Sequence, residues 1–321
     1  MQRRANKRLR RMSEFYHKPV LFEEVLAGLN IKEGGIYYDA TVGGGGHSYG
    51  ILSSGKTVRL IGTDRDEEAI AAASKRLEPF KGRFELYKSN YKDYELILDR
   101  AGADKLDGVL LDFGISSHQI DDEERGFSYR KADAPLDMRM DRTQSFTAED
   151  VVGTYEQDKL CSILRKYGEE SFANSIARNI VREREKAPIK TCGQLAKIVE
   201  ESIPPKFRSA ACARQTFQAI RIEVNGELAG LEECLRGLIQ RLKPGGRMCV
   251  LTFHSLEDRI VKQLFAELAE ECSCPKSFPV CVCGKKNQVI PITKKPIVAG
   301  EEERSLNSRS KCAKLRIAER V

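Results

Sequence analysis

The sequence contains the glycine-rich stretch Asp39-Ala40-Thr41-Val42-Gly43-Gly44-Gly45-Gly46-His47-Ser48, which follows a predicted buried strand over residues 35–41 and precedes a predicted helix. Glycines at such a turn let the backbone approach a ligand closely and adopt conformations that a Cβ atom would forbid. Asp64 stands nineteen residues after Gly45, at the end of a second predicted strand over residues 58–64. A carboxylate at that point can accept hydrogen bonds from both ribose hydroxyls. The two features together predict a site for an adenosine-containing cofactor.

Strand and helix patterns alternate on both sides of this stretch. Residues 66–77 read as a helix, with acidic residues in the first turn and basic residues in the last. Residues 83–91, 106–112 and 247–253 read as further buried strands. This rhythm predicts an α/β, Rossmann-like fold with a doubly wound, mostly parallel sheet and helices on both faces.

The pattern changes after residue 116. Residues 121–141 are polar and irregular, residues 148–203 read as several helices, and residues 213–242 read as one helical run. That run ends at Lys243-Pro244-Gly245-Gly246, which is a stop-and-turn signal. We therefore predict three parts, which are a basic tail over 1–12, a discontinuous domain over 13–116 and 216–321, and an inserted all-helical domain over 117–215 for substrate recognition.

Two other kinds of nucleotide site are alternatives to this one. A dinucleotide fingerprint reads G-x-G-x-x-G/A, and its third position falls here on Ser48 or Tyr49, which disfavours an NAD-dependent oxidoreductase. Residues 50–57 match the P-loop pattern in full, but a helix precedes them and a strand follows, which is the reverse of the order a P-loop needs. We expect Lys56 to be an exposed loop residue.

Polar residues follow two of the predicted strands. Asp112 and Ser116 come at the end of one strand, and His254 follows a later one. Ligands of open α/β sheets gather at the carboxyl ends of strands, so these three are the candidate catalytic residues. Structural roles stay open beside this one: Asp112 as a turn cap, and Ser255 as the N-cap of a helix with Asp258 completing an approximate capping box.

Long words of sequence resemble the bacterial 16S rRNA (cytosine-N4)-methyltransferase family. The resemblance covers nearly the whole chain, from about residue 17 to residue 320. The words that carry it are His17-Lys18-Pro19-Val20-Leu21, Gly43 to Ser48, Arg125-Gly126-Phe127-Ser128-Tyr129, Asp133 to Asp141, Phe217-Gln218-Ala219-Ile220-Arg221-Ile222, Phe253 to Arg259 and Lys314 to Arg320. Such words in this order are far more specific than a single glycine motif.

The resemblance implies a class I methyltransferase fold and transfer of a methyl group from S-adenosylmethionine to N4 of a cytidine in the decoding centre of 16S ribosomal RNA. The partner it implies is that RNA within the small ribosomal subunit. The cofactor contacts that it implies are Gly45, Gly46, His47, Asp64, Tyr91, Asp112 and Gln119. Asp112 would then serve both cofactor and substrate. The family usually has Phe at the position of Tyr91, so the aromatic ring is kept.

An exocyclic amine is a poor nucleophile because its lone pair is delocalised into the base. A carboxylate that accepts an N–H bond can orient the amine and take up its proton, and Asp112 fits that role, with Ser116 assisting. Methyl transfer needs no catalytic metal. A non-catalytic RNA-binding or assembly factor with the same fold is the remaining rival.

The net charge of +7 is largely a property of the N-terminus. Six of the positive charges lie in residues 3–11, and without them the net charge is +1. The tail is compatible with an RNA-binding arm, an unstructured end, or a start codon placed upstream of Met12. The candidate RNA contacts elsewhere are Arg178, Arg182, Arg184, Lys206, Arg208, Arg309, Lys311 and Arg316, although such charges are commonly just solvated surface.

Ten cysteines are scattered along a chain without an apolar stretch of the roughly 18 residues that a membrane span needs. This composition favours a reducing cytoplasm and no membrane, and leaves a monomer or a homodimer open. Cys272, Cys274, Cys281 and Cys283 form a C-x-C-x6-C-x-C cluster. The cluster is compact enough to hold a structural zinc ion, and the alternative is reduced thiols in a loop.

Overall fold

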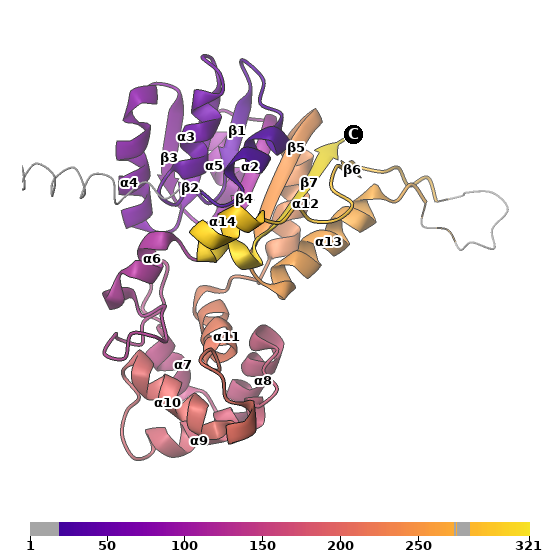
Figure 1. Ribbon diagram of the computed structural model, residues 1–321. Coiled ribbons are helices and arrows are strands. Elements are labelled where there is room, and N and C mark those ends of the chain that lie inside the picture. The colour runs from indigo at the N-terminus through magenta and orange to yellow at the C-terminus, as the bar shows by residue number, and fades with distance from the viewer. Residues whose placement is uncertain (1–18, 273, 275–282) are drawn as a thin grey trace, which may run out of the picture. The chain divides into compact units, whose positions relative to one another are not determined.

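The computed structural model describes residues 19–272, 274 and 283–321 (Figure 1). The chain forms two compact units. The first contains the residues through Asp64, Glu68–Phe113 and Glu232–Val321, and the second contains Arg65–Glu67 and Gly114–Leu231. The predicted basic tail lies outside the described residues. Within the described part of the chain, no helix is long and apolar enough to cross a membrane.

A seven-stranded sheet with the order β3-β2-β1-β4-β5-β7-β6 forms the centre of the first unit. Its strands are β1 (Ile36–Asp39), β2 (Arg59–Asp64), β3 (Phe84–Lys88), β4 (Leu106–Asp112), β5 (Leu242–Thr252), β6 (Val289–Pro291) and β7 (Lys314–Arg320). Strands β1 to β5 pair in parallel, and the order reverses between β1 and β4. This confirms the predicted doubly wound, mostly parallel sheet, and it places a topological switch point at the ends of β1 and β4.

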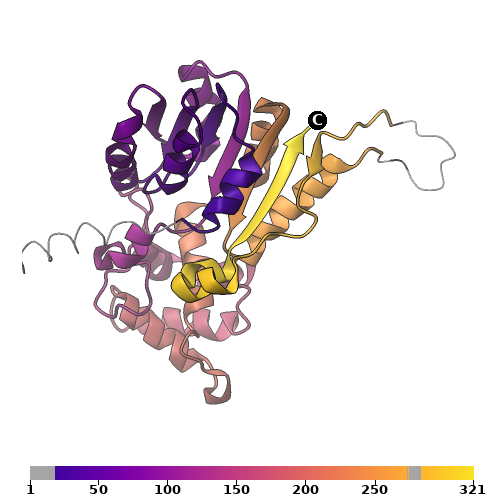
Figure 2. The ribbon, with the colours of Figure 1, turned by 45° about the horizontal axis from the view of Figure 1, so that its top comes forward.

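Two strands of the sheet were not predicted. Strand β7 runs antiparallel to β5 along its length, and β6 pairs with the outer edge of β7. Figure 2 shows β5 and the yellow strand β7 side by side. The order therefore departs from the all-parallel arrangement 3-2-1-4-5-6 of dinucleotide-binding domains.

Helices cover both faces of this sheet. The helices of the first unit are α2 (Phe22–Leu29), α3 (Gly46–Ser53), α4 (Glu67–Leu77), α5 (Tyr94–Arg100), α12 (Leu231–Arg241), α13 (Ser255–Ala269) and α14 (Glu301–Leu306). Val109, Leu110 and Leu111 are consecutive in β4 and at most 1% exposed. Since successive strand residues point to opposite faces, both faces of β4 are buried. Helix α2 packs against β4 and β5 on one face of the sheet, as Figure 2 shows.

The P-loop look-alike is a structural turn. Residues 50–57 span the end of α3 and the connection to β2, as predicted. The backbone N–H groups of Lys56 and Thr57 both donate to the carboxylate of Glu33 at 2.9 Å. Lys56 itself is exposed. These contacts occupy the backbone groups that would otherwise cradle phosphates.

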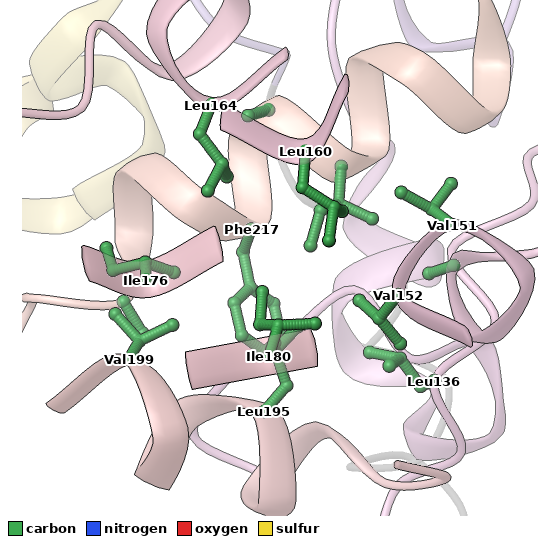
Figure 3. Packing of buried hydrophobic residues seen from close by; sticks show 14 of the residues in the cluster. Leu136, Val151, Val152, Leu160, Leu164, Ile176, Ile180, Leu195, Val199 and Phe217 are labelled. Atoms are coloured by element: carbon green, nitrogen blue, oxygen red, sulfur yellow. The ribbon is translucent and has the colours of Figure 1, made fainter. Parts of the chain in front are cut away.

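The second unit is built almost wholly from helices around one apolar core. The helices are α6 (Ser117–Asp121), α7 (Ala148–Thr154), α8 (Gln157–Gly168), α9 (Ala173–Arg184), α10 (Cys192–Ser202) and α11 (Arg214–Asn225). Figure 3 shows Leu164 of α8, Ile176 of α9, Val199 of α10 and Phe217 of α11 converging in this core. Each of these side chains is at most 4% exposed.

The limits of the second unit differ from the predicted insertion over residues 117–215. The predicted helical run 213–242 is broken, because Gly226 ends α11 in the left-handed conformation at φ 56° and α12 begins at Leu231. Helix α11 packs against α8 and places Phe217 in the helical core. The boundary consequently lies at Leu231, and α11 belongs to the second unit.

A buried ion pair anchors the irregular part of the second unit. The guanidinium of Arg125, which is 1% exposed, donates to Asp66 Oδ2 at 2.8 Å. It also donates to the carbonyl oxygens of Arg139 and Met140. The side-chain amide of Gln119 donates to the same Asp66 oxygen at 2.8 Å. Asp66 and Arg125 together thus join residue 66, residues 119–125 and residues 139–140.

Candidate active site

The glycine stretch forms an open cradle at the start of α3. Gly43 and Gly45 adopt left-handed backbone conformations, at φ 51° and 74°. A Cβ atom added at Gly43 or Gly44 would meet no atom within 4 Å, whereas one at Gly45 would press on Ala73 at 3.1 Å. Gly46 begins the helix against Pro19, which a Cβ would contact at 2.4 Å. The loop is therefore open at Gly43 and Gly44 and closely packed at Gly45 and Gly46.

Asp64 lies beside this cradle, as the spacing predicted. It ends β2, and its Oδ2 accepts the backbone N–H of Gly43 at 2.8 Å. The hydrogen bond joins the carboxylate to the glycine loop. A loop with room outside it and a carboxylate at its edge fit the phosphate-free adenosine and amino-acid parts of S-adenosylmethionine.

His47 lies in the first turn of α3 and is 5% exposed. Its ring stacks on Phe22 at a centroid distance of 5.9 Å. Burial, aided by the charge of Arg76, lowers the pKa of His47 to about 3, so the imidazole is neutral. Its Nε2 lies 3.6 Å from Asp112 Oδ2, and neither ring nitrogen has a hydrogen-bond partner among the described residues. A buried hydrogen-bond donor without a partner costs free energy, and this favours a ligand group beside the His47 ring.

Asp112 ends β4 at the switch point. Its backbone N–H donates to Thr41 Oγ1 at 2.6 Å, which fixes the strand end to the glycine stretch. Its side chain remains 27% exposed. Burial, followed by the negative charges of Asp39 and Glu257, raises the pKa of this carboxyl to about 8. A carboxyl with such a pKa is a far better proton acceptor than an ordinary aspartate.

Asp39 and Thr41 are site residues that the prediction did not single out. Asp39 is 1% exposed at the end of β1, and its Oδ2 accepts the hydroxyl of Ser48 at 2.5 Å. Burial raises the pKa of Asp39 to about 6. Both residues belong to the glycine-rich stretch, so their place at the strand end was the available signal. They hold the loop, and the charge of Asp39 helps to raise the pKa of Asp112.

Tyr91 supplies an aromatic wall in the first unit. It begins a short 3-10 helix, Tyr91–Asp93, after β3 and is 9% exposed. Its ring lies 5.6 Å from that of Phe113, with the planes tilted by 56°. The thiol of Cys234 donates to the carbonyl oxygen of Tyr91 at 3.4 Å. An adenine ring packs well against such a surface.

His254 is the N-cap of α13, which corrects the expectation for Ser255. His254 has the extended backbone of a cap, and its Nδ1 accepts the N–H of Glu257 at 3.4 Å. Glu257 Oε2 accepts the N–H of Phe253 at 2.9 Å and that of His254 at 3.3 Å, which completes the capping box. Ser255 is exposed one residue later. Asp258 instead pairs with Arg316 of β7 at 2.6 Å. Catalysis by His254 stays a prediction.

Ser116 and Gln119 belong to the second unit, where they bond to each other. The backbone N–H of Ser116 donates to Gln119 Oε1 at 3.0 Å, and Ser116 Oγ accepts the N–H of Gln119 at 3.2 Å. Gln119 is 5% exposed and held by Asp66. Sequence reasoning did not identify Asp66 or Arg125 as the support of this turn.

Two of the candidate RNA contacts, Arg316 and Arg184, form hydrogen bonds within the protein. Arg316 is 7% exposed, and its Nε donates to Asp258 Oδ1 at 2.6 Å. Arg184 donates to the carbonyl oxygens of Val152 and Tyr155, and so joins α9 to the end of α7. Arg178 and Lys206 are exposed on the second unit. Of the four clustered cysteines, Cys281 lies outside the described residues.

The raised pKa of Asp112 predicts a pH dependence for any reaction in which it accepts a proton. Only the ionised carboxylate can act, so kcat/KM should rise about tenfold per pH unit well below pH 8 and level off above it. A pH–rate profile from about pH 6 to 9 measures this. The Asp112→Asn variant, which has no carboxyl, should lack the rising limb. A flat profile for the unmodified protein would remove Asp112 as the acceptor.

These features define a Rossmann-like, S-adenosylmethionine-dependent methyltransferase: a doubly wound sheet with an antiparallel seventh strand, an open glycine loop after β1 and a carboxylate after β2. The family model described as "MraW methylase family" matches residues 14–321. The chain belongs to the MraW methylase family.

Curated relatives match over nearly their whole lengths. The chain is 51% identical over 313 residues to "Ribosomal RNA small subunit methyltransferase H" of Lachnospira eligens, covering 96% of this chain and 98% of that protein. It is 49% identical over 310 residues to the protein of the same name from Clostridium botulinum (strain Loch Maree / Type A3), covering 96% and 100%. The predicted class of enzyme and its methyl donor, S-adenosylmethionine, are thus confirmed.

Proposed function

We propose that the enzyme methylates N4 of a cytidine in the decoding centre of 16S ribosomal RNA. Two lines of support converge. Relatives at about half identity are named for the RNA of the small ribosomal subunit, and the resemblance of the long sequence words implies the cytosine-N4 reaction. The observation that carries the chemistry is Asp112, a carboxyl with a raised pKa at the switch point of the sheet.

The site residues of the first unit suit the methyl donor, S-adenosylmethionine. Bound S-adenosylmethionine supplies a methyl group activated by a sulfonium. Asp64 would accept the ribose hydroxyls, and the ring of Tyr91 would pack against adenine. The glycine loop, which is open at Gly43 and Gly44, would receive the amino-acid part. The implied contacts at Gly45 and Gly46 would then be made by their backbone. His47 would donate a hydrogen bond from its neutral ring. Gln119 is the one implied cofactor contact that belongs to the second unit.

Asp112 would act on the acceptor amine. Its carboxylate accepts an N–H bond from N4 and so fixes the amine for in-line attack on the methyl carbon. The new C–N bond forms as the bond from sulfur to the methyl carbon breaks, and the proton leaves nitrogen for the Asp112 carboxylate and then solvent. Ser116 and His254 are proposed to assist, and both assignments rest on their place after strand ends.

The helical second unit is proposed to bind the RNA. It carries exposed cations on several helices, among them Arg165 and Lys166 of α8, Arg178 of α9 and Lys206. Phosphate contacts by such side chains give binding that weakens steeply with salt.

Transfer of labelled methyl groups into small ribosomal subunits that lack their own modification tests this function. We expect incorporation that needs S-adenosylmethionine and does not occur with large subunits. Free 16S RNA in a parallel reaction defines whether the assembled subunit is the substrate. If neither substrate is labelled while the protein still binds the cofactor, the proposed acceptor is wrong.

A further inference from the structure

The two ends of the loop between α13 and β6 are bonded to each other and form the base of the loop. Helix α13 ends at Ala269, and the chain returns to the sheet at β6. Lys285 Nζ pairs with Glu270 Oε2 at 2.9 Å across this base. Just beyond, the N–H of Gln288 donates to the carbonyl oxygen of Leu268 at 2.7 Å. The outgoing and returning arms are therefore held side by side where they leave the body of the unit.

Three cysteines from the two arms lie close together next to this base. Cys272 and Cys274 lie on the outgoing arm, and Cys283 lies on the returning arm. Their sulfur atoms all lie within 4.8 Å of one another, and Sγ of Cys272 and Sγ of Cys283 are 3.8 Å apart. The backbone N–H of Cys274 donates to Cys272 Sγ at 3.3 Å, a contact that stabilises a thiolate.

The spacing fits a tetrahedral metal centre. Zinc–thiolate bonds are about 2.3 Å long, so two sulfurs on one tetrahedral zinc ion lie about 3.8 Å apart. A disulfide needs sulfurs about 2.05 Å apart. Thiolates are soft ligands that select zinc over magnesium or calcium.

We propose that Cys272, Cys274 and Cys283 bind a structural zinc ion that joins the two arms of this loop. Each thiol releases a proton to solvent when its sulfur binds the metal. The fourth coordination position falls to a ligand beyond these three, and Cys281 lies outside the described residues. The proposal is independent of the methyl-transfer site, which uses none of these cysteines. The ion would cross-link the arms beyond the Lys285–Glu270 ion pair and the backbone hydrogen bond from Gln288 to Leu268.

Metal analysis of tag-free protein, purified with a reductant and without chelator, tests the proposal. We expect about one zinc ion per chain in the unmodified protein. Cys272→Ser and Cys283→Ser should each lose most of it. Cys312→Ser, which removes an exposed cysteine outside the cluster, should retain it. Cofactor binding, which depends on the glycine loop, verifies that the variants are folded.

Cobalt reconstitution gives a second readout that does not depend on activity. The apo protein and Cys312→Ser should both gain thiolate-to-cobalt charge-transfer absorption, and Cys272→Ser should lose it. Zinc far below one equivalent together with no cobalt absorption would overturn the proposal. So would zinc retained in full by Cys272→Ser, or a Cys272–Cys283 disulfide in protein kept under reductant.

Discussion

Asp112→Asn should reduce methyl transfer by a factor of about 10² to 10⁴, the usual contribution of a positioned proton acceptor. The amide keeps the size of the side chain and leaves the backbone bond to Thr41 Oγ1 intact. It cannot accept a proton at any pH near neutrality. Single-turnover methyl transfer with saturating cofactor measures the loss at the chemical step.

A purely structural role for Asp112 predicts a different result. If the residue only ends the strand, the variant should transfer methyl groups normally but unfold at a lower temperature. Asp104→Asn, which alters an exposed aspartate before β4, is the matched control and should change neither quantity. Turnover that is undiminished by Asp112→Asn would exclude the residue from the reaction.

Arg125→Met should destabilise the second unit by about 3–5 kcal/mol, because it leaves the charge of Asp66 buried and unpaired. The side chains of Arg125 and Asp66 are only 1% and 4% exposed. The same change also removes the donor from the carbonyl groups of Arg139 and Met140, of which the second is buried. Native-state hydrogen exchange of amides in α8 and α9 measures the free energy of opening of this unit.

Two further variants separate the buried charge from the lost packing. Asp66→Leu combined with Arg125→Met removes both charges, and should recover part of the stability. Lys186→Met breaks an exposed ion pair with Glu183 and should leave the exchange rates nearly unchanged. If Arg125→Met behaves like Lys186→Met, the pair does not stabilise the unit.

Local patterns predicted the parallel half of the fold because each signal was contained in a few neighbouring residues. Strand β4 was predicted over residues 106–112, where it lies. Strand β7 was missed because an inward charge interrupts its apolar alternation. Arg316 is buried there only because Asp258, which is distant in sequence, neutralises it. No local pattern carries that information.

The candidate site likewise contains residues that local patterns predicted and residues that they did not. Gly45 and Asp64 were predicted because a fixed spacing connects a glycine loop to the next strand end. The support of Gln119 was not predictable, since Asp66 and Arg125 meet it only through the tertiary structure. The cap of α13 was assigned one residue late, because serine is the commoner cap and His254 lacks that bias.

Nucleoside mass spectrometry of the methylated RNA is the most direct test of the central claim. Small subunits treated with the enzyme and S-adenosylmethionine would be digested, and the modified nucleoside identified and mapped within 16S RNA. We expect N4-methylated cytidine at one position in the decoding centre, with a much lower yield in the same reaction time when Asp112→Asn replaces the enzyme. A methyl group on a ring carbon, on ribose or on another base would contradict it.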